Sequence, residues 1–223
     1  MKLKGLILVV VLTVVSLTSG EAARIVFPQA AVGPLEDEEF QIELYLANRD
    51  PNVPWEGTLW FLKGLDLTPA TGVTVRIPPG NAQNVGDYLA VQLPPGGSTS
   101  YYLSSSQLTV GVLVIESETA APENLVASFF YRLVSHGQGK DLIAVQPSRS
   151  PSLAYSATLT RRNGLDVGLA LVADEAVTKA IRELPIPSTD VTLTFTSPSG
   201  EPQVKVVQLN ETNGFHQAAF PFE

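Results

Sequence analysis

The side chains that most often perform catalysis are scarce in this chain and form no catalytic pattern. The chain has no cysteine and two histidines, His136 in a glycine-rich turn and His216 near the C-terminus. Ser135 directly precedes His136, but adjacent residues do not make a nucleophile–base pair, and no Gly-x-Ser-x-Gly elbow occurs. Glycoside hydrolysis needs two carboxylates facing each other across a cleft, and no spacing among the 22 acidic residues singles out such a pair. The sequence therefore predicts a protein that is not an enzyme, with glycoside-active chemistry as a remote alternative.

The densest group of candidate metal ligands is the acidic run at residues 36–39. Calcium prefers oxygen ligands, and acidic loops can supply them. The candidate ligands are Glu36, Asp37 and Glu38, and Asp50 joins them only if the chain folds back beyond the next strand. No Asp-x-Asp-x-Asp-Gly loop is present, so a solvated acidic face is the alternative explanation. We expect no required cofactor, with calcium as the alternative.

Aromatic side chains offer a third kind of chemistry, because sugar-binding β-sandwiches stack such rings on the faces of pyranoses. Large apolar residues alternate with other residues around positions 45 and 60. This alternation predicts that Tyr45 and Trp60 point away from the core, on strands that could be neighbours. The alternative is that outward rings pack against a second domain or fill cross-strand pairs. The other aromatic candidates for a binding site are Trp55, Tyr88, Tyr101 and Tyr102.

The N-terminal residues have the pattern of a removable secretion signal. Lys2 and Lys4 precede an apolar run at residues 6–15, and small residues follow, including Gly20 and Ala22. Cleavage is expected after Ala22, which assigns residues 1–22 to a signal peptide. The run is too short to span a bilayer comfortably, and no later segment reaches the roughly 18 apolar residues of a membrane helix. We therefore expect a secreted or periplasmic mature chain with no membrane span.

Composition limits the partners and the forces that hold the fold. The formal net charge of −8 becomes −9 when the leader takes away Lys2, Lys4 and Glu21. Nucleic acids and anionic membrane surfaces are bound by clustered basic residues, and the only adjacent pair in the mature chain is Arg161 and Arg162. We therefore expect no nucleic-acid partner. Because there is no cysteine, hydrophobic burial must hold the fold without disulfides, and this favours a bacterial envelope or secreted protein.

The apolar residues recur with a period of two, which is typical of half-buried β-strands. In residues 40–46 the even positions are all large and apolar, whereas Gln41 and Glu43 face away. Leu59 and Phe61 are inward candidates for the same reason. Turn-forming residues interrupt the pattern at spacings of about 8–12 residues, as in a β-sandwich or barrel.

Two segments depart from this alternation. Residues 125–134 are apolar at both odd and even positions, which predicts a strand covered on both faces. Residues 174–184 place apolar side chains on one helical face, so they predict a short helix. Asp174 is the expected cap of that helix, and Pro185 is expected to end it.

The strands divide into two parts separated by a polar, proline-containing linker. We expect a β-sandwich domain at 23–146, a linker at 147–152 and a smaller β-sandwich-like domain at 153–223. The apolar alternation of residues 40–46 recurs at residues 165–171, which favours related units. The predicted fold is all-β, with two immunoglobulin-like antiparallel β-sandwich units in tandem. The second unit is short, so we expect it to lean on the first unit or on a partner.

Several strand-and-turn motifs carry a resemblance to a known class of proteins. They are Phe27-Pro28-Gln29 and the segments Leu93–Ser98, Val167–Leu171, Asp190–Phe195 and Ser197–Gly200. Together these motifs make the chain similar to secreted bacterial immunoglobulin-like β-sandwich modules of unknown function. The resemblance implies a fold and an extracellular location, and it implies no activity.

Residues Arg24–Pro28 resemble the first strand of periplasmic pilus chaperones, which also have two immunoglobulin-like domains. That resemblance implies that Arg24 and the alternating apolar residues engage a protein subunit. The observations together predict a non-catalytic exported structural, adhesive or protein-interaction module. The alternative is a carbohydrate-binding module, assisted by calcium, and the partner is then a cell-surface polysaccharide in place of a protein.

Overall fold

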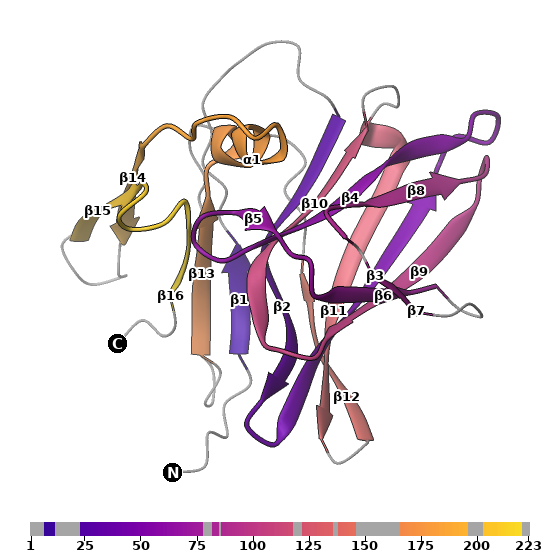
Figure 1. Cartoon of the computed structure of the whole chain (residues 1–223), viewed down its shortest axis with the longest axis horizontal. Helices are drawn as coiled ribbons and strands as arrows, with labels where there is room; N and C mark the ends of the chain where they lie inside the picture. The colour runs from indigo at the N-terminus through magenta and orange to yellow at the C-terminus, as the bar shows by residue number, and fades with distance from the viewer. Residues whose placement is uncertain are drawn as a thin grey trace.

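The computed structural model describes residues 7–11, 23–77, 82–84, 86–117, 122–135, 138–145, 166–195 and 203–219. Within these residues the chain forms sixteen β-strands, one α-helix and one turn of 3-10 helix. Most of the strands belong to a curled antiparallel sheet, drawn on the right of Figure 1. The expected all-β class is therefore confirmed.

The curled sheet contains eleven strands, and its two halves face each other across a core. We call the halves sheet I and sheet II. Sheet I contains β8 (Leu89–Leu93) and β5 (Thr68–Pro69) along one edge of β4 (Trp55–Lys63), then β10 (Thr109–Ser117) and β2 (Ala23–Leu35). Sheet II contains, in order, β12 (Gln138–Val145), β11 (Leu125–Ser135), β3 (Glu38–Asn48), β9 (Ser98–Ser105), β6 (Val73–Arg76) and β7 (Ala82–Asn84).

Strand β2 joins the two halves, because its first part pairs with β10 and its last three residues pair with β3. The strand leaves β10 at Gly33, whose φ of 105° lies in the region that glycine tolerates best. A Cβ added at Gly33 would overlap the backbone carbonyl oxygen of Gln107. Glycine is thus required at this corner for both its conformation and its small size.

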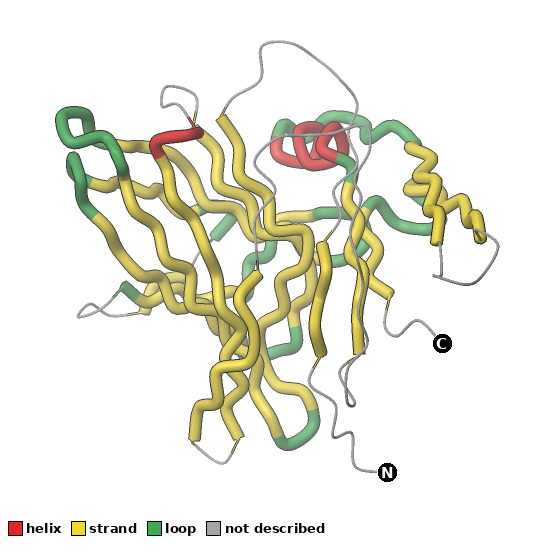
Figure 2. Tube along the Cα trace, turned by 180° about the vertical axis from the view of Figure 1, so that it is seen from behind, coloured by secondary structure: helices red, strands yellow, loops and turns green. Residues whose placement is uncertain are grey.

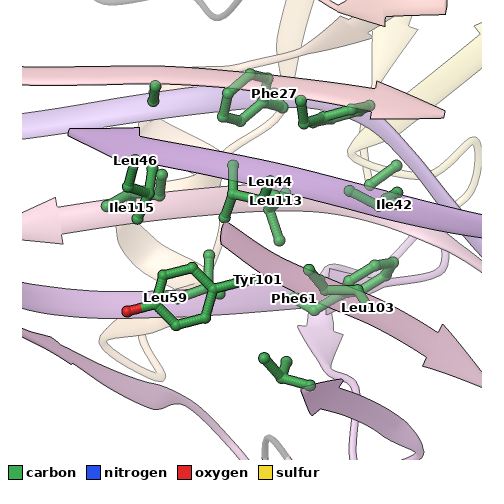
Figure 3. Close-up of a cluster of buried hydrophobic side chains, with 14 of the residues drawn as sticks. Phe27, Ile42, Leu44, Leu46, Leu59, Phe61, Tyr101, Leu103, Leu113 and Ile115 are labelled. Atoms are coloured by element: carbon green, nitrogen blue, oxygen red, sulfur yellow. The ribbon is translucent and has the colours of Figure 1, made fainter. Parts of the chain in front are cut away.

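The core between the two halves contains the alternating apolar residues that the sequence predicted to face inward. Ile42, Leu44 and Leu46 of β3 and Leu59 and Phe61 of β4 are almost completely buried, as expected. Figure 3 shows these side chains gathered between the strands, together with others from β2, β9 and β10. The inward residues of two facing sheets interdigitate in this way because each strand presents every second side chain to the same face.

Tyr131 of β11 brings a polar atom into this core. Its side chain is buried, and its hydroxyl donates a hydrogen bond of 3.0 Å to the backbone carbonyl oxygen of Gln29. Burial raises the pKa of Tyr131 far above the ordinary value of 10.0, because the charged phenolate would lose its hydration. The folded protein therefore keeps the phenolic proton in alkaline solution.

This burial predicts a specific loss of stability in alkali. Above about pH 10 the unfolded chain releases the proton of Tyr131 while the folded chain retains it, so unfolding is favoured as the pH rises. We expect the free energy of unfolding to fall by about 1.4 kcal/mol per pH unit from this group. Urea titrations on both sides of that pH measure the slope. The variant Tyr131→Phe should have a shallower slope, and an unchanged slope would contradict the assignment.

The C-terminal part of the chain forms smaller sheets and a helix. Its elements are β13 (Asp166–Val172), α1 (Asp174–Ile181), β14 (Thr189–Phe195), β15 (Gln203–Leu209) and β16 (His216–Ala219). Strand β13 pairs with β16, and β14 pairs with β15 in a two-stranded ribbon. The predicted helix is confirmed, but it ends at Ile181, before the Pro185 that was expected to end it. Figure 1 and Figure 2 both show α1 and β13 between the ribbon and the curled sheet.

A second apolar cluster joins this part to the outer face of sheet I. Val112 and Val114 of β10 pack there with Ala176 and Val177 of α1. Strand β10 is therefore covered on both faces, since its intervening residues point into the first core. The expectation that the short C-terminal part leans on the first part is confirmed.

Residues assigned to the signal peptide include β1 (Ile7–Val11), which pairs in parallel with β13. Cleavage after Ala22 stays a prediction. The expected linker at 147–152 and the first residues of the expected second domain, 153–165, lie outside the described residues.

Candidate functional site

A buried ionic cluster ties sheet I to helix α1. The guanidinium of Arg24 bonds Glu116 Oε1 at 3.1 Å, Asp174 Oδ1 at 3.2 Å and Thr178 Oγ1 at 2.6 Å. All four side chains are buried. This cluster gives the side chains no exposed surface for a ligand, so we assign it a structural role.

The cluster changes two expectations from the sequence. Asp174 does not cap α1: the cap residue is Ala173, which makes no side-chain capping bond, and Asp174 binds Arg24 instead. Arg24 was expected to engage a protein subunit, as in pilus chaperones, but here its guanidinium is held inside the molecule. Charged groups removed from water need partners of this kind.

The outer face of sheet II is exposed to solvent, whereas the outer face of sheet I packs against α1 and its neighbours. Phe130 of β11 is 40% exposed and Tyr45 of β3 is 38% exposed. The expectation that residues 125–134 are covered on both faces is therefore wrong. Phe129 faces the core and is fully buried, whereas Phe130 points outward. We call this outer surface the open face and define it by Gln41, Glu43, Tyr45, Arg76, Tyr102, Phe130 and Arg132.

Strand register places four of these residues in one row across four strands. Phe130 lies opposite Glu43, Glu43 opposite Tyr102, and Tyr102 opposite Arg76. The Tyr102 hydroxyl donates a 3.0 Å hydrogen bond to Glu43 Oε1. The guanidinium carbon of Arg76 lies 5.4 Å from the centre of the Tyr102 ring, within cation–π range. The row therefore carries an aromatic ring, an acid, a second ring and a base that already contact one another.

Tyr102 keeps its proton at ordinary pH. The hydrogen bond to Glu43 raises the pKa of Tyr102 above 10.0, with desolvation adding to the rise and Arg132 and Arg76 opposing it. A phenol with a raised pKa stays protonated and keeps donating to the carboxylate. Tyr102 thus fixes the Glu43 carboxylate in position.

Tyr45 stands beside this row with small neighbours on either side. Ser128 of β11 and Ser100 of β9 lie directly opposite Tyr45 on the two adjacent strands. Phe130 and Tyr102 are its diagonal neighbours, within reach of aromatic side chains across the sheet. Three rings on three neighbouring strands therefore surround the Glu43 carboxylate.

The other aromatic candidates do not join this group. Trp55 and Tyr101 are almost completely buried in the first core, and burial raises the pKa of Tyr101. Trp60 points outward, but from sheet I, where it packs against the second cluster and lies 5.1 Å from the Tyr88 ring. Trp60 therefore packs against another part of the chain, which was the alternative to a sugar-binding role. Tyr45 and Trp60 lie on different halves of the curled sheet and do not share a site.

The candidate metal ligands are not brought together as a set. Glu36 and Asp37 form the turn before β3, and Glu38 begins that strand, whereas Asp50 follows its far end. Eleven residues of extended strand separate the two ends by more than about 30 Å. Asp50 Oδ1 instead accepts from the backbone N–H groups of Asn52 and Val53. No group of three or more metal-ligating side chains occurs within the described residues.

Sequence reasoning missed Arg76 and Phe130 as parts of the site. The alternation of residues 40–46 correctly turned Glu43 outward, but it carried no information on which strands lie beside β3. Strands β11 and β9 follow β3 in the chain by more than fifty residues, and β6 joins through β9. A site made by non-local pairing has no local signal in the sequence.

None of the helical segments in the described part of the chain has the length and apolar character needed to cross a lipid bilayer. Comparison of the chain with models of protein families, with curated proteins and with solved structures gives no match.

Proposed function

We propose that this protein is an exported, non-catalytic module that adheres to or binds its partner through the open face of sheet II. The observation that carries this proposal is the contrast between the two outer faces. Helix α1 and its neighbours cover sheet I, whereas the open face leaves Tyr45 and Phe130 exposed beside ordered charged side chains. Exposed aromatic residues combined with arginine are typical of binding surfaces.

The proposal includes a fold relationship to immunoglobulin-like β-sandwiches. The pairings β3–β9–β6 and β4–β10 follow the B–E–D and C–F order of that fold. The first and last strands differ, since β2 lies beside β10 and β11 lies beside β3. We propose that the C-terminal part is a reduced second unit that supports the first one, and that the N-terminal leader directs export.

A binding array tests the proposed function. We expect the labelled, purified chain to bind one class of polysaccharide or envelope protein on the array. The double variant Tyr45→Ala/Phe130→Ala should lose at least about tenfold in affinity, because aromatic anchors contribute much of the energy of such surfaces. The matched control is Tyr88→Ala, which removes an exposed ring from the other half of the molecule. Equal losses in the two variants would refute a specific role of the open face.

Calcium is not part of this proposal. The carboxylates expected to bind it lie at opposite ends of β3, and Asp50 is occupied in its own loop. We expect a chelator to leave binding on the same array unchanged.

A further inference from the structure

We infer that β13 binds an extended aliphatic strand of a second protein, in the place that β1 occupies in the full-length chain. This inference rests on the proposed export of the protein, because cleavage of the leader after Ala22 would remove β1. The surface differs from the open face. The class of partner is a polypeptide with a run of about five aliphatic residues in β conformation.

Strand β1 shows which kind of segment fits beside β13. It pairs with β13 in parallel and in one uninterrupted register, from Ile7 opposite Asp166 to Val11 opposite Ala170. All five residues of β1 are aliphatic. Both β1 and β13 also contact β2 of the curled sheet. Strand β1 therefore covers the edge of β13 that β16 leaves free, as Figure 1 shows.

Strand β13 has the sequence of an interior strand and not that of an edge strand. Residues Val167–Val172 contain neither a charged residue nor a proline. Edge strands commonly carry charges, prolines or bulges, which prevent pairing with other chains. Strand β12, at an edge of sheet II, has such protection, because it contains Lys140 and Asp141 and its register with β11 is interrupted beside Asp141. Without β1, the unprotected edge of β13 would be open to another strand.

Other contacts hold the C-terminal end of β13 in place when β1 is removed. Leu171 and Val172 are buried in the second apolar cluster, together with Val26 of β2. Asp174, which follows β13 closely, is held by its ion pair with Arg24. Removal of the leader would therefore leave a preformed edge with unpaired backbone N–H and C=O groups. A preformed edge lowers the entropic cost of binding a strand.

The backbone of that edge selects a polypeptide as the ligand. An extended polypeptide supplies N–H and C=O groups at the spacing that a strand edge requires, and a sugar polymer or a nucleic acid does not. Two copies of this chain related by a two-fold axis would pair their β13 strands antiparallel, whereas the strand observed here runs parallel to β13. A different protein therefore fits the edge better than a second copy.

Peptide binding to the exported chain tests this inference. The protein is purified after export of the full-length precursor, and mass spectrometry determines whether it begins at Ala23. The probe is a fluorescent peptide with the sequence of β1, Ile-Leu-Val-Val-Val, between two pairs of lysines that keep it soluble. We expect anisotropy titration to give a Kd on the order of 10 μM. Hydrogen exchange should slow at the backbone amides of β13 when the peptide binds.

Two controls match the probe and the protein. In the first, proline replaces the central valine of the peptide, so the charge stays the same but a backbone hydrogen bond is lost. We expect its affinity to be at least about tenfold lower. The second is the full-length chain made by cell-free translation without membranes, which should bind neither peptide because β1 covers the edge. Val9→Pro in that chain should release β1 and restore binding of the unmodified peptide.

The contrary results have distinct meanings. Equal binding of the two peptides, slowed exchange outside β13 or no binding would overturn the inference. A dimer of the exported chain that the peptide dissociates would assign the edge to a second copy, and an exported chain that retains residues 7–11 would make β1 a permanent strand. Both results also overturn it. In each case the open face is tested separately by Tyr45→Ala/Phe130→Ala. If the chain is not exported, the inference and the export in the proposed function both fail.

Discussion

Replacing Arg24 with methionine should lower the free energy of unfolding by about 3–5 kcal/mol, because it leaves two buried carboxylates without their cation. Arg24 is the shared partner of Glu116 on the neighbouring strand and of Asp174 on α1. Both acids are buried, so water cannot replace the guanidinium without opening the contact between sheet I and the helix. Denaturant titration monitored by circular dichroism measures the loss.

The control for this prediction removes all three charges together. A variant with Arg24→Met, Glu116→Leu and Asp174→Leu no longer has an unpaired buried charge, and apolar replacements of buried ionic groups are often well tolerated. We expect it to be more stable than Arg24→Met alone. If Arg24→Met lost less than about 1 kcal/mol, the ion pairs of Arg24 would be as weak as exposed ion pairs. That result would contradict their assignment as buried interactions that stabilise the contact between sheet I and α1.

The variant Phe129→Ala should lose about 3–5 kcal/mol, because it removes a large ring from the centre of the core. Phe129 is fully buried, with its ring centre 4.8 Å from that of Phe27 and 5.1 Å from that of Tyr131. These contacts join β2 to β11, so the cavity would lie between the two halves of the curled sheet. Urea unfolding gives the change in free energy.

The neighbouring residue provides a matched control. Phe130→Ala removes the same side chain from the same strand, one position further on, where it is 40% exposed. We expect that variant to lose less than about 1.5 kcal/mol, since little of its ring is taken out of water. If the two variants lost equal stability, the assignment of inner and outer faces on β11 would be wrong.

Much of the fold follows from local sequence. The alternation at residues 40–46 predicted which side chains of β3 enter the core, and Leu59 and Phe61 were predicted in the same way. The helix at residue 174 was also predicted, because apolar residues at helical spacing precede a proline. Each of these features depends on neighbours in the chain, which the sequence displays directly.

The features that the sequence did not predict depend on non-local contacts. The apolar outer residues of β10 and β11 look alike in sequence, yet α1 covers Val112 and Val114 while Phe130 stays exposed. Aspartate is a residue type that often caps helices, but Asp174 instead forms an ion pair with Arg24 of β2. The open face has the same origin, because Glu43, Tyr102 and Arg76 meet only through strand pairing.

The partners of Arg24 also set the order in which the chain can complete its structure. Asp174 and Thr178 lie 150 and 154 residues after Arg24 in the chain. During synthesis, Glu116 is therefore the first of these three partners that can bind the Arg24 guanidinium. Until the later residues arrive, Val112 and Val114 remain uncovered on sheet I. Contacts between residues so far apart in the sequence form slowly, and apolar surface that is prone to aggregation stays exposed until they form. We therefore expect the packing of sheet I to be completed only after residues 174–178 have been added to the chain.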